Sequence, residues 1–197
     1  MDGLLIAFEG LDQSGKETQA RRLRAWFQHA GRRVEMLDFP CYTTHIAEEI
    51  AAALRGEREY GPDALQLLYI ANRYEYRARI VAWLQAGAVV ICDRYLASSI
   101  AYGEAQGLDP AWLADTQRHL PQPDLTILLD IAPATAVERK ARGRDRFERD
   151  LGLLSRVRES YLRQAAAANW VRIDGEREKD EVTDAIVEAI SARLAPR

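Results

Sequence analysis

Short apolar runs alternate with helical patterns along the chain. Five such runs predict strands. Residues 88–92 lack polar alternation, as expected for a strand buried on both faces of a sheet, and residues 125–131 predict another buried strand. Between the runs, apolar residues recur every three or four positions, which predicts helices. The predicted strands are residues 4–8, 34–39, 88–92, 125–131 and 170–173. The predicted helices cover residues 16–30, 46–54, 62–86, 98–106, 110–120, 135–142, 154–165 and 182–194.

The order of these elements determines the expected fold. Five strands that alternate with helices predict an α/β domain, with a five-stranded parallel sheet and helices on both faces. A length of 197 residues suits a single domain, residues 1–197, with a substantial core. In such sheets, ligands bind beyond the carboxyl ends of the strands. The segments that follow these ends are therefore the candidate sites.

Composition and charge narrow the possible partners. The formal net charge is −3, so we expect no nucleic-acid partner, and the chain is 48% hydrophobic and 29% charged, as in ordinary globular proteins. The apolar start is too short to span a bilayer and lacks a basic flank, so we expect neither a membrane partner nor a signal peptide. Cys41 and Cys92 lie far apart and lack metal spacing, which favours a reduced, cytoplasmic protein.

A glycine-rich loop, Gly10 to Thr18, connects the first predicted strand to the first predicted helix. Its glycines let the backbone turn so that N–H groups can hold phosphate oxygens, and Lys16 adds a full positive charge. This P-loop motif normally continues with a hydroxyl residue that ligates Mg²⁺, but Glu17 stands there and Thr18 follows. The structural alternative is a loop that only joins two elements. We expect phosphate binding by Gly10, Gln13, Ser14, Gly15, Lys16, Glu17 and Thr18.

A polar triplet, Asp93-Arg94-Tyr95, follows the predicted strand at residues 88–92. Arg94 should project beyond the carboxyl end of the sheet, where a guanidinium can bind a phosphate bidentately. Asp93 could pair with Arg94, or hold Mg²⁺ directly or through water. The structural alternative is a salt bridge at the end of a strand. The glycine loop on the same edge favours a phosphate site.

A second basic cluster, at residues 142–149, interrupts two predicted helices as a hinged lid would. Arg142, Arg144 and Arg146 occupy alternate positions in it. The glycine loop is neutral where a basic residue could reach a terminal phosphate, so we expect a lid arginine to meet the transferring phosphoryl group. The structural alternative is a solvated charged surface.

Several motifs together resemble the thymidylate kinase family over nearly the whole chain. The glycine loop occurs in many families, whereas Ala71-Asn72-Arg73 and the motif that begins with Asp93 are more specific. The matching segments are residues 8–19, 39–40, 67–73, 93–98, 101–102, 123–126 and 173–175. The neutral loop and the arginine-bearing segment resemble the bacterial arrangement of this family, in which the lid supplies the catalytic cation.

The resemblance implies a nucleotide site with Mg²⁺ and with ATP as co-substrate. The implied substrate-binding residues are Asp12, Phe39, Tyr69, Arg73, Arg94, Ser98, Ser99 and Tyr102. The implied catalytic residues are Asp12, Lys16, Arg94 and Arg142. ATP would be bound by the glycine loop together with Arg142, Arg144 and Arg146. The metal would lie near Asp12 and Asp93.

Individual roles follow from the matching positions. Arg94 resembles the arginine that binds the acceptor phosphate, and Arg73 resembles the one that contacts a base carbonyl. Tyr69 would stack on the pyrimidine from the same helix face as Arg73, four residues away. Tyr102 resembles the aromatic residue that crowds the sugar 2′ position, and Asp12 the carboxylate that meets the 3′-hydroxyl. The remaining members are Phe39, which would pack beside the nucleotide, and Ser98 and Ser99 near the base.

The expected reaction is transfer of the γ-phosphoryl group of Mg·ATP to the 5′-phosphate of dTMP, and the family is usually homodimeric. Two alternatives stay open. Cys41, Tyr42 and Gly103 depart from the common pattern around the acceptor, which allows a kinase for another (deoxy)nucleoside monophosphate. A nucleotide-binding regulatory module without kinase turnover is the other alternative, although it would not need acceptor-side residues such as Arg73 and Arg94.

Overall fold

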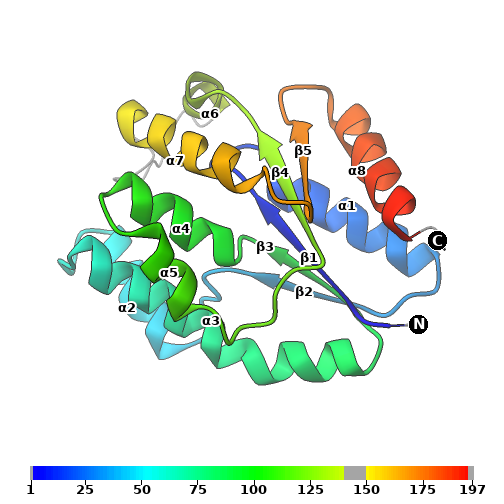
Figure 1. Ribbon diagram of the computed structural model, residues 1–197, viewed down its shortest axis with the longest axis horizontal. Helices are drawn as coiled ribbons and strands as arrows, with labels where there is room; N and C mark the ends of the chain where they lie inside the picture. Colours follow the sequence, from blue (N-terminus) through cyan, green and yellow to red (C-terminus); the bar gives the residue numbers. More distant parts are fainter. Residues whose placement is uncertain (1, 140–149, 195–197) are drawn as a thin grey trace.

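A computed structural model describes residues 2–139 and 150–194. Five parallel strands form one sheet with helices on both faces, as the sequence predicts (Figure 1). The strand order, which the sequence did not predict, is β2-β3-β1-β4-β5. The strands are β1 (Leu4–Glu9), β2 (Val34–Asp38), β3 (Val89–Asp93), β4 (Leu125–Asp130) and β5 (Trp170–Asp174). The helices are α1 (Lys16–His29), α2 (His45–Leu54), α3 (Pro62–Gln85), α4 (Leu96–Ala105), α5 (Pro110–Thr116), α6 (Pro133–Arg139), α7 (Leu151–Gln164) and α8 (Lys179–Leu194).

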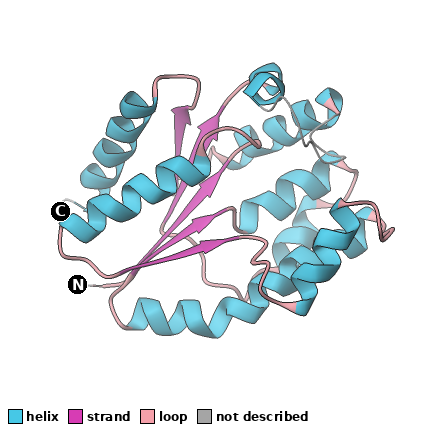
Figure 2. Ribbon diagram, turned by 180° about the vertical axis from the view of Figure 1, so that it is seen from behind, coloured by secondary structure: helices cyan, strands magenta, loops and turns pink. Residues whose placement is uncertain are grey.

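Different helices cover the two faces of the sheet (Figure 1 and Figure 2). Along β1, Ile6 and Phe8 pack with the apolar sides of α1 and α8, whereas Leu5 and Ala7 pack on the other face with residues of α3. α4 and α7 pack against each other over the part of this second face near Leu128. Because both faces are covered, the sequence of β1 is apolar from Leu4 to Phe8.

Each of the five strands ends on an acidic residue: Glu9, Asp38, Asp93, Asp130 and Asp174. Because the strands are parallel, these residues lie along one edge of the sheet. The buried carboxylate of Asp130 is neutralised by arginines from α7 and β5. An anionic ligand at this edge therefore needs cations between itself and the carboxylates.

Several helices begin or end a few residues from their predicted boundaries, and two of them, α4 and α5, bear on the candidate site. α4 begins two residues earlier than predicted, because the Glu9 carboxylate caps it by accepting hydrogen bonds from the backbone N–H groups of Tyr95 (2.8 Å) and Ser98 (3.3 Å). α5 ends at Thr116 and not at Leu120, because the backbone then tightens into turns whose hydrogen bonds join residues three apart. Both differences lie next to the candidate site.

The predicted arginine-rich lid, residues 142–149, lies outside the described residues, and so does the end of the predicted helix 135–142. Within the two described ranges, no helix is long and apolar enough to cross a membrane. Cys41 and Cys92 are both free thiols.

Candidate active site

The glycine loop joins β1 to α1 at the carboxyl edge of the sheet. Gly10 has a φ of 139°, and a Cβ atom there would lie 2.4 Å from the carbonyl oxygen of Leu129, so only glycine fits. Gly15, which precedes the first residue of α1, has a φ of 93°, a conformation that L side chains rarely adopt. The backbone therefore requires both glycines, and the loop leads directly into the positive end of a helix.

A cavity at this loop, called the loop hollow below, contains most of the predicted phosphate-binding residues. Its lining is Asp12, Gln13, Gly15, Lys16, Glu17, Thr18, Asp38, Phe39, Pro40, Tyr42, Asp93 and Arg94. Of the predicted set, only Gly10 and Ser14 are absent from this lining, and both are buried. The structure thus brings the loop together with the polar ends of β2 and β3.

Lys16 is a buried cation of the loop hollow. The residue is only 6% exposed, and its Nζ donates a hydrogen bond to the carbonyl oxygen of Leu11 at 2.8 Å. Burial, together with the nearby charge of Arg94, lowers the pKa of Lys16 to about 8. A phosphate anion beside Nζ would favour the charged form and raise this pKa again.

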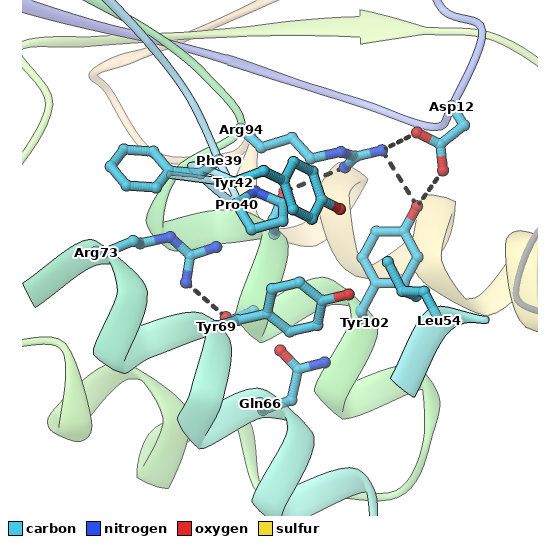
Figure 3. A pocket seen from close by; sticks show the side chains of 12 residues that line it. Asp12, Phe39, Pro40, Tyr42, Leu54, Gln66, Tyr69, Arg73, Arg94 and Tyr102 are labelled. Carbon is cyan, nitrogen blue, oxygen red and sulfur yellow. Dashed lines mark hydrogen bonds and ion pairs between the residues drawn. The ribbon is translucent and has the colours of Figure 1, made fainter. Parts of the chain in front are cut away.

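A second cavity, called the aromatic pocket below, is drawn in Figure 3. It shares part of its lining with the loop hollow. Its lining is Asp12, Phe39, Pro40, Tyr42, Leu54, Gln66, Tyr69, Arg73, Arg94, Ser98, Ser99 and Tyr102. Every residue that the resemblance assigns to substrate binding is part of this lining. Leu54 and Gln66 were not predicted, because their spacing fits an ordinary helix. The residues that line both cavities are Asp12, Phe39, Pro40, Tyr42 and Arg94.

Arg94 stands in the wall between the two cavities. It has a φ of 62°, which is uncommon outside glycine, at the turn from β3 into α4. Its Nη2 forms a salt bridge of 2.6 Å with Oδ1 of Asp12. Its Nη1 donates to the hydroxyl groups of Ser98 and Tyr161, both at 3.2 Å. The carboxylate partner of Arg94 is therefore Asp12, and not the adjacent Asp93 that the sequence left as a possibility.

A buried carboxylate lies behind Arg94. Glu9 is fully buried, and its Oε2 accepts hydrogen bonds from Ser98 Oγ (2.6 Å) and the Tyr161 hydroxyl (3.0 Å). Burial and the charge of Glu9 raise the pKa of Tyr161 well above its ordinary value, so its hydroxyl keeps its proton. Two hydroxyl groups thus connect the cation of Arg94 to the anion of Glu9. Sequence reasoning missed Glu9 and Tyr161, although an acid within an apolar strand was a usable signal.

Arg73, on α3, lies at another end of the aromatic pocket (Figure 3). It is 2% exposed, and its Nη1 donates to Ser99 Oγ at 2.7 Å and to Gln117 Oε1 at 3.3 Å. Its Cζ lies 6.0 Å from the centre of the Phe39 ring. In the part of the chain that the structure describes, no carboxylate forms an ion pair with Arg73. Tyr69 lines the same pocket, as its spacing from Arg73 predicts.

Both the sequence and the fold of the chain have counterparts among known proteins. The family model described as thymidylate kinase matches residues 8–186. The chain belongs to the thymidylate kinase family. Enzymes of this family are nucleoside monophosphate kinases, which phosphorylate dTMP to dTDP using ATP.

Individual thymidylate kinases agree with the family model. A probable thymidylate kinase of Pyrococcus abyssi is 36% identical over 203 residues, which cover 98% of this chain and 98% of that protein. The thymidylate kinase of Arabidopsis thaliana is 33% identical over 188 residues, which cover 95% of this chain and 71% of that protein. A solved structure of the Candida albicans thymidylate kinase, described as revealing the origin of broad substrate specificity, matches with a TM-score of 0.87 at 30% identity and covers 98% of this chain and 92% of that one.

The loop hollow of this family member is lined by carboxylate oxygens of the kind that Mg²⁺ prefers. Asp12, Asp38 and Asp93 line it, and burial together with the charge of Asp93 raises the pKa of Asp38. Mg²⁺ prefers such oxygens and completes its shell with water and substrate phosphates. The described residues contain no group of three or more side chains that could hold a metal alone. The donor set therefore fits an ion that is shared with the nucleotide. Sequence reasoning missed Asp38.

Glu17, which replaces the usual hydroxyl residue of the loop, has a partner of its own. Its Oε1 forms an exposed salt bridge of 2.6 Å with Arg21, one helical turn further along α1. Thr18 is also exposed at the edge of the loop hollow. Glu17 thus contributes negative charge near the cavity while its carboxylate is engaged on the helix surface.

The lid arginines Arg142, Arg144 and Arg146 lie outside the described residues. Sequence reasoning did not assign a role to Arg139, a basic residue that precedes them in the chain. Arg139, at the end of α6, donates from Nη1 to the carbonyl oxygens of Gln13 (3.2 Å) and of the residue after β5 (3.0 Å). It therefore ties the glycine loop to the segment after β5. Helical spacing could not reveal this role, because both partners are backbone atoms.

Proposed function

We propose that the chain carries out the family reaction across the wall that its two cavities share, with Mg·ATP in the loop hollow and dTMP in the aromatic pocket. The observation that carries this proposal is the position of Arg94, which lines both cavities. A donor phosphate at the glycine loop and an acceptor phosphate at Arg94 would face each other. Phosphoryl transfer depends mainly on such positioning and on charge neutralisation.

On the donor side, Lys16 and the backbone N–H groups of the loop bind the phosphates of ATP. The loop residues with this role are Gly10, Gln13, Ser14, Gly15, Glu17 and Thr18. Mg²⁺ would be held near Asp12 and Asp93, with Asp38 beside them, and when bound it neutralises charge on the phosphate oxygens.

On the acceptor side, Arg94 exchanges Asp12 for the 5′-phosphate of dTMP, and Asp12 then meets the sugar 3′-hydroxyl. Tyr69 stacks on the base, and Arg73 donates to a base carbonyl oxygen. Tyr102 crowds the 2′ position and so favours deoxyribose. The other members of this site are Phe39, Ser98 and Ser99.

The acceptor oxygen needs no strong general base. Its phosphate has a second pKa of about 6, so the oxygen is largely ionised at neutral pH. It attacks the γ-phosphorus, and the bond from that phosphorus to the bridging oxygen of ADP breaks. None of the described residues that line the two cavities is a histidine. Arg142 of the lid, with Arg144 and Arg146 as alternates, is the proposed cation that closes over the transferring group.

The remaining proposals concern the surroundings of the enzyme. We propose a homodimer by resemblance to a usually dimeric family, a cytoplasmic location because both cysteines are free, and no nucleic-acid or membrane partner. Size-exclusion chromatography with light scattering tests the dimer, and a single species of 22.3 kDa would contradict it.

The decisive experiment measures ADP release from Mg·ATP with dTMP, dUMP, dGMP, dCMP, UMP or no acceptor. Strong turnover with dTMP supports the proposal. Turnover with another monophosphate alone would support phosphoryl transfer but not dTMP as the acceptor. The departures from the family pattern at Cys41, Tyr42 and Gly103 would then be the candidates that determine acceptor preference. ATP binding without turnover on any acceptor would favour the regulatory module.

A further inference from the structure

Arg73 is a buried cation that forms no ion pair with any described carboxylate, although the charge of Glu9 acts on it without direct contact. Its Nε is enclosed and has no hydrogen-bond partner, while its Nη1 has two neutral acceptors. Burial lowers the pKa of Arg73, but a guanidinium keeps its proton in proteins. Buried charges are normally paired, so an unpaired one that lines a cavity indicates an interaction that a ligand completes.

One of the two acceptors, Gln117, is held in a fixed orientation. It follows the last residue of α5 and is 2% exposed. Its Nε2 donates to the carbonyl oxygens of Leu96 (3.2 Å) and Leu113 (3.1 Å). Because both amide hydrogens are engaged on α4 and α5, Oε1 is directed at Nη1 of Arg73. Sequence reasoning did not single out Gln117, which lies where a continuous helix was predicted.

A carboxylate at position 117 would be the obvious partner for a buried arginine, yet the chain has an amide there. A carboxylate would form an ion pair with Arg73 and neutralise its charge, whereas an amide orients the guanidinium without neutralising it. We infer that Gln117 is a positioning residue, which holds Arg73 through a neutral hydrogen bond and leaves its positive charge to the base of the acceptor. The inference rests on the proposed function, in which Arg73 faces a base carbonyl oxygen.

A purely structural role makes different predictions. If Gln117 only ties α4 to α5 through the carbonyls of Leu96 and Leu113, its loss lowers stability and affects all substrates alike. If it orients a free charge, its replacement changes acceptor recognition and leaves ATP recognition intact, because Arg73 does not line the loop hollow. Acceptor KM, ATP KM and base preference therefore distinguish the two roles.

Two substitutions test the inference in opposite ways. Gln117→Glu adds the missing negative charge, and Gln117→Met removes the acceptor oxygen but keeps an unbranched side chain. With saturating Mg·ATP, we expect the KM for dTMP to rise about 10- to 30-fold in Gln117→Glu and about 3- to 5-fold in Gln117→Met. The KM for ATP should change by less than about 2-fold in both. The ratio of kcat/KM for dTMP to kcat/KM for dCMP should decrease roughly 5-fold in Gln117→Glu only. Cytosine has an amino group where thymine has a carbonyl oxygen, so dCMP loses less when the charge of Arg73 is neutralised.

Gln122→Glu is the matched control. It adds the same charge five residues further along the chain, at an exposed position whose Nε2 donates to the carbonyl oxygen of Leu120 at 3.0 Å. We expect wild-type values of KM and of base preference in this variant. If both Gln117 variants match Gln122→Glu in the KM for dTMP, the inference is overturned. If Gln117→Glu does not fold, an unchanged KM in Gln117→Met overturns it.

A thermal measurement tests the inference without any substrate. Arg73→Met removes an unpaired charge from the wild-type protein, so its unfolding midpoint should stay constant or rise. In the Gln117→Glu background, the same substitution leaves a buried carboxylate unpaired and should lower the midpoint by about 4 °C or more. An equal shift in both backgrounds contradicts the inference. If the wild-type enzyme phosphorylates no monophosphate, the proposed function fails, and this thermal comparison alone decides the role of Gln117.

Discussion

The two arginines of the aromatic pocket are held in opposite ways. Arg94 has one carboxylate, Asp12, in direct contact and a second, Glu9, behind two hydroxyl groups. Arg73 has no carboxylate in direct contact and donates hydrogen bonds only to the neutral oxygens of Ser99 and Gln117. The half-buried Arg94 is therefore held by charge, and the buried Arg73 is held by neutral hydrogen bonds.

The difference follows from what each arginine has to bind. A phosphate carries full negative charge, so it can displace Asp12 from Arg94 while Glu9 keeps the rest of the guanidinium in place. A base carbonyl oxygen carries only a partial charge, and it would lose a competition with a carboxylate. A cation that binds a neutral base must consequently have no carboxylate in direct contact.

Arg94→Ala should disrupt the charge-held end of the pocket and give the largest effect. We expect kcat/KM for dTMP to fall about 1000-fold, because the acceptor phosphate and the developing charge both lose a cation. Asp12 and Glu9 would also lose their shared partner, so the unfolding midpoint should fall by about 5 °C. Steady-state kinetics and calorimetry measure both effects. Turnover within about 10-fold of the wild type would refute the assigned role.

Arg73→Met should disrupt the base-binding end of the aromatic pocket without lowering the stability of the fold. We expect kcat/KM for dTMP to fall roughly 50-fold, mainly through KM, because base binding is lost and the transferring group is untouched. The unfolding midpoint should not fall, since no carboxylate is left unpaired. A midpoint decrease as large as that of Arg94→Ala would show that the two arginines are held alike.

Tyr161→Phe should loosen Arg94 without removing it. Only a hydroxyl is lost, and its partner Ser98 still connects Arg94 to Glu9, so we expect a decrease of about 5- to 10-fold in kcat/KM for dTMP. Tyr74→Phe is the control, because that hydroxyl donates to the carbonyl oxygen of Thr116 at 2.9 Å, outside the pocket lining. In an Arg94→Ala background, Tyr161→Phe should have no further effect on turnover, and an additive loss would contradict coupling through Arg94.

Lys16 extends the comparison to a buried cation that can lose its proton. Its pKa is lowered to about 8 in the free protein, and a bound phosphate raises it. ATP binding should therefore be accompanied by proton uptake at Lys16 above pH 8. Near pH 6.5, Lys16 is already protonated, so binding should take up almost no protons through it. The affinity for ATP should fall as the pH rises through 8. Calorimetry in buffers of different ionisation enthalpy counts these protons. Equal proton uptake by the wild type and Lys16→Met at pH 8.5 would exclude Lys16 as their source.

Local patterns in the sequence predicted the fold and most of the loop hollow, whereas the predicted residues of the aromatic pocket came mainly from the family resemblance. Unbroken apolar runs identified the buried strands, and residues that follow strand ends necessarily meet at one edge of a parallel sheet. The supporting residues were harder to find. Glu9, Tyr161 and Gln117 act through partners that lie 44 to 152 residues away along the chain, and no local pattern marks such pairs. Asp38 became recognisable only when the strand order placed it opposite Asp93.

The cap that Glu9 provides for α4 has an evolutionary consequence. This residue immediately precedes the glycine loop, yet it fixes the start of the helix that carries Ser98 and, through Tyr161, a point on α7. Replacing any one of Glu9, Ser98 and Tyr161 leaves the other two side chains without one of their hydrogen-bond partners. Positions 9, 98 and 161 should therefore covary among relatives, and acceptor preference should diversify through residues outside this set.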